Sequence, residues 1–421
     1  MTPSHVADRL EPTQPRRAPN DTVGGPRGSQ AMAGQASGTR SRDVHLHLSF
    51  SSLRMASRAF REGLAALDSG HAERVEYLGC DDGRSAEAPP DPGRLFVKRL
   101  PPPPSPPGSP RVLRIASLPR WYASVFREVR RRRDFDLIIA HNLASLPIAV
   151  LLKRVTRTRL LYDAHELETQ REGWSWPIRW AAQVAESLLM PHVNHTLVVS
   201  DTIRAWYERR YPKAGFTTVR NTPSVVGPVQ KSEALRRQLG LREEELLCVF
   251  LGMLSPGRGI EEMVEAFRQL PDDKHVVFVG HGVLRECLSA DAQTHRNIHV
   301  LPPVAGSEVV SYASGADVGV VISAGKSLSY RYSLPNKLFE YAHAGLPVIV
   351  SDLPEFRNFV EREGLGWVIP PTPDALRDLV LGLSREQVRR MPKRETSPPS
   401  WETEAPRLLG VYHMLAHSAD G

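Results

Sequence analysis

The chain has 421 residues, of which 41% are apolar and 24% charged, so it is long enough for two ordinary water-soluble domains plus tails. Its net charge is +7, and its three cysteines lack metal-like spacing, which argues against a disulfide scaffold or a zinc site. The N-terminus has no apolar run followed by a cleavage site, and the longest apolar window is interrupted by His, Asn and Pro. We therefore expect a cytoplasmic protein without a signal peptide or a membrane span.

Two stretches of the chain should lack regular structure. Residues 1–42 consist largely of Gly, Pro, Ser and Arg with almost no large apolar side chains, so we expect a disordered N-terminal tail. Order should begin at DVHLHLSF. The segment LPPPPSPPGSPR, residues 100–111, can form only an extended loop.

Elsewhere, short apolar strands alternate with amphipathic helices. This pattern indicates an α/β fold with parallel sheets covered on both faces. Two such sets predict two Rossmann-like domains, 43–222 and 223–395, with a polar seam near 221–233 and a C-terminal helical segment, 396–421. Each sheet should bind ligands at the carboxyl ends of its strands, which places the active site in a cleft between the domains. The expected strands are HLHLSF, RVEYLG, VLRIAS, DLIIAH, RLLYDAH and HTLVVS, and then LCVFLGM, HVVFVG, NIHVLP, VGVVIS, PVIVSD and GWVIPP.

Positive charge is concentrated in PRWYASVFREVRRRRDFD, residues 119–136. As a helix, this segment separates Tyr122, Phe126 and Val129 from most of its arginines, among them Arg130–Arg133. Such a helix could lie on an anionic membrane, which would place the protein at the inner membrane face. The alternative is a solvated basic face on an ordinary helix. No nucleic-acid partner is expected, because no recognisable nucleic-acid module accompanies the arginines.

The segment CVFLGMLSPGRGIEEM runs from a strand through a turn into a helix. Gly257 and Gly259 permit close backbone approach, the helix N-terminus supplies unpaired N–H groups, and Arg258 adds a fixed positive charge. Together these features predict a phosphate site, with a plain strand-to-helix turn as the alternative. The later segment VVFVGHGVLRE contains Gly280 in a weaker pattern, because the third glycine of a dinucleotide fingerprint would fall at Arg285.

A second phosphate signal lies in SLPNKLFEYAHAGLPVIVSD, residues 333–352. The backbone N–H groups from Ser333 to Asn336 could hold an anion at a helix start, and Lys337 would reinforce that charge. Glu340 lies one turn further on, where its carboxylate could accept hydrogen bonds from the two hydroxyls of a ribose. The combination predicts a nucleoside diphosphate site, with half-buried structural polarity as the alternative for Glu340.

Several segments together carry a family resemblance. PGRGIEEMVEAF, VFVGHGVLRE and SLPNKLFEYAHAGLPVIVSDLPEFRNFV resemble, in this order, the donor half of the retaining glycosyltransferases of family 4, which have the GT-B fold. DLIIAHNLASLPIAVLLKR, TRLLYDAHELETQ and HTLVVSDTIRAWYERRYP resemble their acceptor domain. The resemblance covers about residues 43–390. It implies a nucleotide-sugar donor, with Arg258 and Lys337 at the diphosphate and Glu340 at the ribose.

The chain departs from the family pattern in two places. The family often has two glutamates eight positions apart, and the first of them would fall at Tyr332 here, so the donor sugar must be contacted otherwise. The glycine-rich loop that usually follows the first strand is SFSSLRMASR here and contains no glycine. Ser51 and Ser52 in this loop could still approach an acceptor.

Histidines follow two expected strands of the first half. His141 comes after DLIIA and His165 after LLYDA, so both should face the cleft, and a structural role is the alternative for each. By resemblance, His141 takes the place of a histidine that contacts the reacting sugar, and Glu166 in DAHE lies on the acceptor side. The acidic motif DFD, residues 134–136, precedes a strand and should be solvated. We therefore expect no metal ion and no cofactor, with Arg258 and helix N-termini in place of a metal.

These patterns predict a glycosyltransferase that moves a sugar from a nucleotide-diphosphate-sugar donor to a glycan, lipid or small-molecule acceptor with retention of configuration. His141, His165 and Arg258 are the expected catalytic residues. An epimerase or phosphorylase of the same architecture is one alternative. A degenerate, non-catalytic sugar-nucleotide-binding subunit is another, because of Tyr332. A dehydrogenase is disfavoured by the incomplete dinucleotide fingerprint.

Overall fold

The computed structural model describes residues 44–52, 57–80, 91–101, 111–225, 227, 229–392, 394 and 396–417. For residues 51, 52, 57 and 111–114 it describes the backbone and not the side chains. The expected N-terminal tail, 1–42, and most of the expected proline-rich loop, 102–110, lie outside the described residues.

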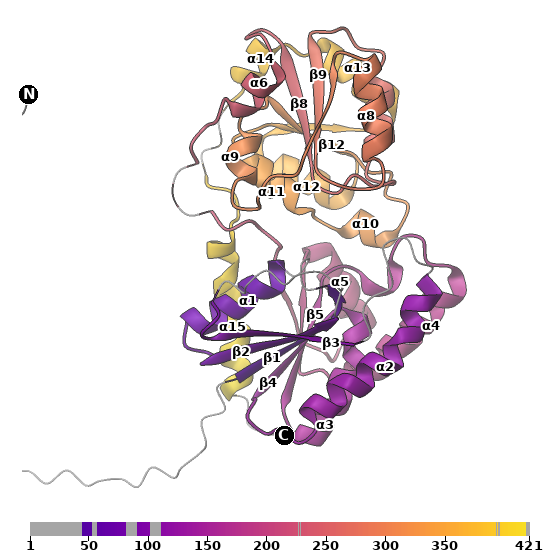
Figure 1. Cartoon of the computed structure of the whole chain (residues 1–421), viewed down its shortest axis with the longest axis vertical. Coiled ribbons are helices and arrows are strands. Elements are labelled where there is room, and N and C mark those ends of the chain that lie inside the picture. Colours follow the sequence, from indigo (N-terminus) through magenta and orange to yellow (C-terminus); the bar gives the residue numbers. More distant parts are fainter. Residues whose placement is uncertain are drawn as a thin grey trace, which may run out of the picture. The chain divides into compact units, whose positions relative to one another are not determined.

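Two parallel sheets form the framework (Figure 1). The first has seven strands in the order β3-β2-β1-β4-β5-β6-β7, and the second has six in the order β10-β9-β8-β11-β12-β13. The strand succession therefore reverses between β1 and β4 and between β8 and β11, where open α/β sheets bind ligands. The first sheet consists of β1 (Val44–Ser52), β2 (Arg74–Cys80), β3 (Leu95–Leu100), β4 (Leu137–His141), β5 (Arg159–Ala164), β6 (His195–Val198) and β7 (Phe216–Thr218). The second consists of β8 (Leu246–Leu251), β9 (Lys274–Val279), β10 (Ile298–Leu301), β11 (Val318–Val321), β12 (Val348–Ser351) and β13 (Gly366–Ile369).

Helices cover both faces of the first sheet, because its strands are apolar on both sides. Ile138 and Ala140 of β4 belong to the core under one layer of helices, whereas Leu137 and Ile139 belong to the core under the other. The first layer consists of α2 (Arg111–Val129), α3 (Leu146–Thr156), α4 (Trp176–Leu189) and α5 (Asp201–Arg210), with the short helices η2 (Leu143–Ser145), η3 (Glu168–Gln170) and η4 (Met190–His192) between them. The second layer consists of α1 (Ser57–Asp68) and α15 (Trp401–His417).

The second sheet is also covered on both faces. Val249 and Leu251 of β8 pack under one layer, and Cys248 and Phe250 pack under the other. The first layer consists of α6 (Ala234–Leu239), α9 (Val309–Ala313), α11 (Asn336–His343) and α12 (Pro354–Glu363). The second consists of α7 (Ile260–Phe267), α8 (Arg285–Thr294), α13 (Pro373–Gly382) and α14 (Arg385–Arg389). The short helix α10 (Leu328–Tyr332) belongs to this half of the chain, yet its Leu328 and Tyr332 pack against the core of the first half.

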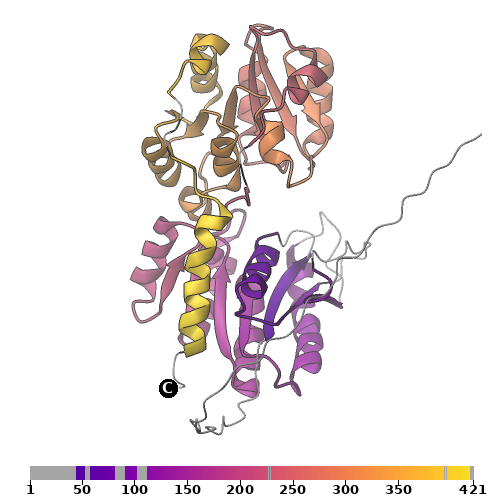
Figure 2. The same cartoon turned by 90° about the vertical axis from the view of Figure 1, so that its left-hand side faces the viewer.

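The C-terminal helix returns to the first half of the chain. Figure 2 shows α15, in yellow, lying along the first sheet. Its Leu408 and Tyr412 are buried in the same core as residues of α1, and its Glu404 forms an ion pair with Arg220 at 3.1 Å. Contacts join residues 42–421 into one compact unit, so the domain boundaries at 222 and 395 stay a prediction.

One expected strand is wrong, and two strands escaped prediction. VLRIAS, residues 112–117, lies in α2, because its apolar residues continue at helical spacing through the buried Trp121, Val125 and Val129. Strand β3 is the edge of its sheet and buries only its two ends, so its LFVKRL sequence lacks the apolar run of a central strand. Strand β7 is an edge strand of three residues.

The basic segment also differs from the expectation. Helix α2 ends at Val129, so Arg130–Arg133 lie in the turn that follows it and not on a helix face. Arg132 is engaged by protein, with its Nη1 and Nη2 donating to the carboxylate of Glu76 at 2.7 and 2.8 Å. In the described part of the chain, no helix combines the length and the apolarity needed to cross a bilayer.

Candidate active site

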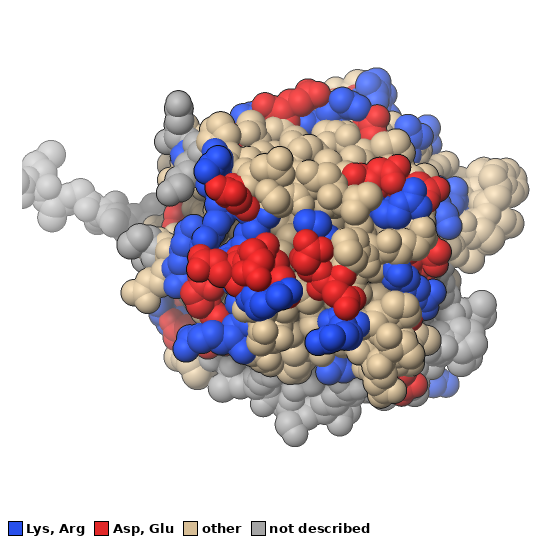
Figure 3. Space-filling model, turned by 90° about the horizontal axis from the view of Figure 1, so that it is seen from above, with Lys and Arg blue, Asp and Glu red and all other residues tan. Residues whose placement is uncertain are grey.

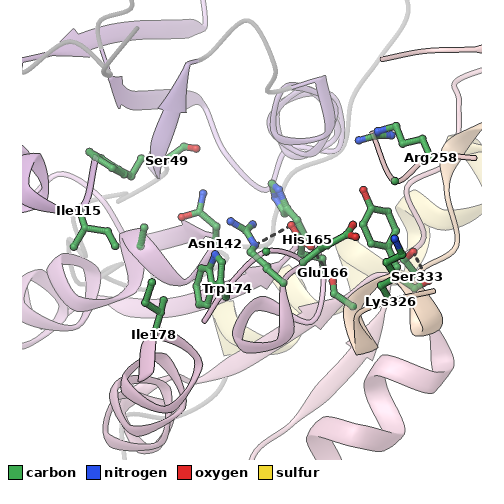
Figure 4. Close-up of a pocket in the computed structure, with 18 of the residues that line it drawn as sticks. Ser49, Ile115, Asn142, His165, Glu166, Trp174, Ile178, Arg258, Lys326 and Ser333 are labelled. Carbon is green, nitrogen blue, oxygen red and sulfur yellow. Dashed lines mark hydrogen bonds and ion pairs between the residues drawn. The ribbon is translucent and has the colours of Figure 1, made fainter. Parts of the chain in front are cut away.

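A cavity of about 920 Å³ opens at the carboxyl ends of both sheets (Figure 4). Phe50 of β1 and Asn142 after β4 contribute to its wall from the first half. Arg258 after β8 and Lys326 after β11 contribute from the second half. These are the two pairs of strands at which the sheet orders reverse, so the cavity lies where the fold is expected to bind a ligand.

Beneath the first-half wall, Asp163 is the centre of a buried polar network. Its Oδ2 lies 2.7 Å from His165 Nε2 and 3.0 Å from His141 Nδ1. Arg58 donates to both carboxylate oxygens, from Nε at 3.1 Å and from Nη2 at 3.0 Å. Asp163 and His141 are fully buried, whereas the side chain of His165 is 33% exposed and lines the cavity. His141 Nε2 is in turn 2.8 Å from His47 Nδ1.

This network fixes the protonation of its members. Burial alone would raise the pKa of Asp163, but the charge of Arg58 and the contacts with both histidines hold that pKa well below its usual range. Burial lowers the pKa of His141, which is therefore a neutral imidazole at pH 7. The ionised Asp163 accepts a hydrogen bond from His165 Nε2, which leaves Nδ1 as the ring nitrogen of His165 that Asp163 does not engage.

The same atoms are close enough for one metal ion. His141 Nδ1, Asp163 Oδ2 and His165 Nε2 lie within 4.8 Å of one another. Arg58, however, donates to the same Oδ2, and its positive charge opposes a cation at that oxygen. The residues therefore fit a hydrogen-bonded network better than a metal centre. A second group of three potential ligands, wholly buried, consists of His47, Glu62 and His141.

Glu166 and helix α10 connect the two halves at the cavity wall. The Oε2 of Glu166 accepts a hydrogen bond from Ser329 Oγ at 2.8 Å, and its Oε1 lies 2.9 Å from Arg171 Nε. Ser200 Oγ donates to the backbone carbonyl of Tyr332 at 2.6 Å. Tyr332, which occupies the place of the first family glutamate, thus contributes a backbone group to this junction.

The second-half wall presents positive charge to the cavity. Arg258 Nε donates to Ser255 Oγ at 3.0 Å, and Lys326 is exposed. Among the described residues, neither cation has a carboxylate within 4.0 Å. Gly257 and Gly259 have φ values of 80° and 74°, a left-handed backbone that favours glycine, and Gly259 is the N-cap of α7. Two cations without a carboxylate partner, beside a helix N-terminus, form a site suited to an anion.

Lys337 and Glu340 lie on the first turns of α11, behind this wall. Lys337 Nζ is 3.2 Å from the centroid of the Phe250 ring, a cation–π contact. Burial and the charge of Arg258 lower the pKa of Lys337 well below its usual range, against the effect of Glu340. Burial raises the pKa of Glu340, against the effects of Lys337 and Arg61. Among the described residues, no side chain donates a hydrogen bond to the Glu340 carboxylate.

The structure brings some of the expected site residues together at the cavity and leaves others outside it. The residues that line it are His165, Glu166, Gly257, Arg258 and Ser333. The residues that lie outside its wall are His141, Gly259, Gly280, Asn336, Lys337 and Glu340. His141 differs from the expectation that it faces the cleft, because it is fully buried under His165. Ser51 and Ser52 end β1, and their side chains lie outside the part that is described. The roles of all these residues in binding and catalysis stay predictions.

Sequence reasoning also missed residues at the cavity. Lys326 follows β11 in a loop whose sequence, AGKSLSYRYSLP, gives no sign that its lysine is unpaired. Asn142 has a φ of 72°, which is unusual for a residue other than glycine, and its position directly after β4 was the available signal. Asp163, the last polar residue of β5, was hidden in an apolar strand pattern. Gly280, which was predicted and lies outside the cavity wall, is closely packed, since a Cβ there would clash with the carbonyl oxygen of Gly252.

Two family models match the chain, one in each half. Residues 54–222 match the model described as glycosyl transferase 4-like domain, and residues 245–386 match glycosyl transferases group 1. TuaC of Bacillus subtilis (strain 168), whose name assigns it provisionally to teichuronic acid biosynthesis as a glycosyltransferase, is 27% identical over 162 residues. That match covers 38% of this chain and 39% of TuaC, and the chain spans less than half the length of the curated relatives it matches.

Solved structures of low sequence identity share the fold. Sucrose-phosphate synthase from Thermosynechococcus elongatus has a TM-score of 0.69 at 18% identity, with 90% of this chain and 100% of that chain covered. HepE of Anabaena, solved in complex with UDP and glucose, has a TM-score of 0.61 at 16% identity, with 89% of this chain and 98% of that chain covered. With its two Rossmann-like sheets in the GT-B arrangement and a family match in each half, the chain belongs to the group 1 glycosyltransferases.

Proposed function

We propose that the chain transfers a sugar from a nucleoside diphosphate sugar to a hydroxyl-bearing acceptor. The observation that carries this proposal is one cavity with two cations free of carboxylate partners, Arg258 and Lys326, on one side and His165 and Glu166 on the other. Cations fixed beside a departing diphosphate stabilise the charge that develops as its bond to the sugar breaks. Family membership and the UDP and glucose bound to HepE support the same donor class.

The donor nucleotide binds on the second half. Arg258, Lys326 and the N-terminus of α7 hold the diphosphate, and Lys337 adds charge from behind the wall. Glu340 accepts hydrogen bonds from the ribose hydroxyls. The absence of a side-chain donor to its carboxylate among the described residues supports this role, because a partly buried carboxylate needs partners.

In the proposed step, the acceptor oxygen forms a bond to the anomeric carbon, and the bond between that carbon and the diphosphate oxygen breaks. The electron pair leaves with the diphosphate, whose departing oxygen takes the acceptor proton from the same face of the sugar. This geometry retains the anomeric configuration. His165 contacts the reacting groups from the cavity wall, whereas the buried His141 acts through Asp163 as a positioning residue.

Turnover of a labelled nucleotide-sugar distinguishes this function from its alternatives. Radioactive sugar attached to an added glycan, lipid or small-molecule acceptor, with the anomeric configuration conserved in the product, is the expected outcome. Conversion of the donor to an isomeric nucleotide-sugar without any acceptor would instead identify an epimerase. Donor binding without turnover on any acceptor class would identify a non-catalytic subunit. The donor for the assay is chosen by thermal shift, since a ligand at 100 times its dissociation constant stabilises a protein by about 2.7 kcal/mol.

Metal independence is part of the proposal. Arg258 and Lys326 line the cavity and can balance the charge of a diphosphate without a metal ion, and Arg58 disfavours an ion at Asp163. Transfer should therefore proceed at an unchanged rate in excess EDTA after the protein has been dialysed against chelator. Loss of transfer under these conditions, restored by manganese or zinc, would refute this part and point to the cluster of His141, Asp163 and His165.

A further inference from the structure

Exposed large apolar side chains are concentrated on three neighbouring helices. Six of the ten such side chains among the described residues belong to α2, α3 and α4. These helices pack side by side, α2 against α3 and α3 against α4 (Figure 1). The six residues are Ile115, Leu151, Trp176, Trp180, Val184 and Leu188.

Four of the six form a stripe along α4. Trp176, Trp180, Val184 and Leu188 follow one another at intervals of four residues, which places them on one face of the helix. Their exposed fractions are 75%, 57%, 38% and 69%. A helix of a water-soluble protein normally packs such an apolar face against its core. Two exposed tryptophans on one stripe therefore indicate a surface that binds a membrane or another protein.

The same three helices carry positive charge without carboxylate partners, whereas the acids of these helices are buried or paired. Helix α4 has one acid, Glu186, which is buried and accepts hydrogen bonds from Tyr207 at 2.8 Å and Tyr211 at 3.0 Å. The only acid of α2 and α3 is Glu128, which is 2.6 Å from Lys98. Five arginines on these helices or directly after them are exposed or half-buried, and none has a carboxylate partner among the described residues: Arg120, Arg127, Arg154, Arg157 and Arg179. By contrast, basic and acidic side chains are interspersed on the face shown in Figure 3.

We infer that the α2–α4 face, formed by these six apolar residues and five arginines, docks on an anionic lipid surface. Tryptophan rings are favoured at the boundary between lipid headgroups and acyl chains, and each exposed arginine is attracted by anionic headgroups. On this face only positive charge is left without a partner of opposite sign, which favours an anionic lipid surface over a protein partner. The basic segment Arg130–Arg133 is not required, since it lies beyond α2 and its Arg132 is bound to Glu76.

The position of the face also selects the class of acceptor. Ile115 of α2 and Ile178 of α4 both line the cavity, as does Trp174 just before α4. The docked face therefore continues into the cavity wall. Resting on the proposed transfer activity, this continuity names the acceptor as an amphiphile whose hydroxyl-bearing head enters the cavity while its apolar part stays in the lipid.

Vesicle flotation of the full chain tests the docking surface. The chain should float with vesicles of phosphatidylcholine containing about 30% phosphatidylglycerol and remain behind with phosphatidylcholine alone, and the binding should weaken as salt rises. Trp176→Ser with Trp180→Ser should reduce partitioning at least about ten-fold, because the stripe supplies the inserted apolar surface. The matched control, Val283→Ser with Leu381→Ser, removes exposed apolar residues elsewhere and should float like the parent chain.

Arginine substitutions separate the electrostatic attraction to anionic lipid from the insertion of apolar side chains. Arg154→Gln with Arg157→Gln should weaken binding to anionic vesicles roughly five-fold for each arginine removed. Arg389→Gln with Arg390→Gln, at the C-terminal end of α14, provides the control and should leave binding unchanged. Unfolding midpoints equal to that of the parent establish that each variant is folded.

Three results would overturn the inference. The first is no flotation of the parent chain with anionic vesicles, and the second is equal flotation of the parent and the tryptophan variant. The third is a dimer in sedimentation that the tryptophan substitutions dissociate, since a second copy of the chain would then cover the face. None of the substituted residues lines the cavity, so nucleoside diphosphate binding should be unchanged in every variant. Failure of the parent chain to bind the nucleotide would challenge the proposed function. Failure to float, with nucleotide binding intact, would challenge only the docking surface.

Discussion

His165 Nε2 lies 2.7 Å from Asp163 Oδ2, so a fully buried carboxylate orients a histidine that reaches the cavity. The charge of Arg58 keeps the Asp163 carboxylate ionised. His141 Nδ1 lies 3.0 Å from the same Oδ2 atom. Asp163 thus contacts two histidines that differ in their access to the cavity. His165 lines the cavity, whereas His141 is fully buried and reaches the cavity only through its contacts with Asp163 and His165.

Replacement of His165 tests the first-half wall. His165→Ala should lower kcat/KM for transfer by about 10- to 150-fold, because a hydrogen bond from a polar partner to charged reacting groups contributes roughly 1.5–3 kcal/mol. The dissociation constant of the nucleoside diphosphate should stay within about two-fold of the parent value, because the proposed nucleotide site lies on the second half of the chain. Steady-state kinetics with calorimetry measures both quantities. An unchanged kcat/KM would remove His165 from the mechanism.

The lowered pKa of Lys337 makes proton uptake a signature of diphosphate binding. In the free protein, burial and Arg258 lower this pKa well below its usual range, and a bound anion would raise it. Between the two pKa values, binding takes up a proton, so affinity should fall as pH rises through that window. Calorimetry at one pH in buffers of different ionisation enthalpy measures the uptake. Lys337→Met should abolish the part of it that belongs to the lysine, and equal uptake in both proteins would exclude Lys337 as its source.

Glu186 predicts a specific dependence of stability on pH. Burial raises its pKa to about 7, while hydrogen bonds from Tyr207 and Tyr211 act in the opposite direction. Below its ordinary value of 4.5 the carboxyl is protonated in both the folded and the unfolded chain. Between 4.5 and about 7 only the folded chain keeps the proton, so the free energy of unfolding should decrease as pH rises through this window, by about 2–4 kcal/mol in total.

Glu186→Gln provides the test of this linkage. The variant cannot ionise at this position, so its free energy of unfolding should decrease less between pH 5 and pH 8 than that of the parent. Urea denaturation of both proteins at the two pH values gives the comparison. Parallel pH profiles would mean that Glu186 does not hold a proton in the folded state.

The sequence was sufficient to predict the strands whose apolar pattern matches their burial in the fold. Runs such as LIIA and PVIV must be buried on both faces, and their alternation with helices allowed the two sheets and the position of the cavity to be predicted. Gly257 and Arg258 could be predicted in the same way, because glycines and a charged residue between a strand and a helix are visible in the sequence.

Depth and pairing could not be predicted from the sequence. The position of His141 at the end of a strand does not reveal that His165, directly after the next strand, covers it. Lys326 is distinguished only by the lack of a carboxylate within 4.0 Å among the described residues, which is a property of the folded chain. On α4, apolar residues occur all around the helix, so periodicity does not show that Trp176 and Trp180 are the ones left without a core.

Calorimetry of nucleoside diphosphate and free nucleoside binding to Arg258→Ala and Glu340→Ala tests the central claim most directly, with UDP and uridine as the first pair. Arg258→Ala should weaken diphosphate binding about 10- to 150-fold and leave nucleoside binding nearly unchanged, because in the proposed site its guanidinium contacts phosphate only. Glu340→Ala should weaken the binding of both ligands by a similar factor, because in the proposed site its carboxylate contacts the ribose that they share. If both variants bind UDP as the parent does, while their unfolding midpoints show them to be folded, the donor nucleotide does not bind at Arg258 and Glu340 and the assignment of the site is wrong.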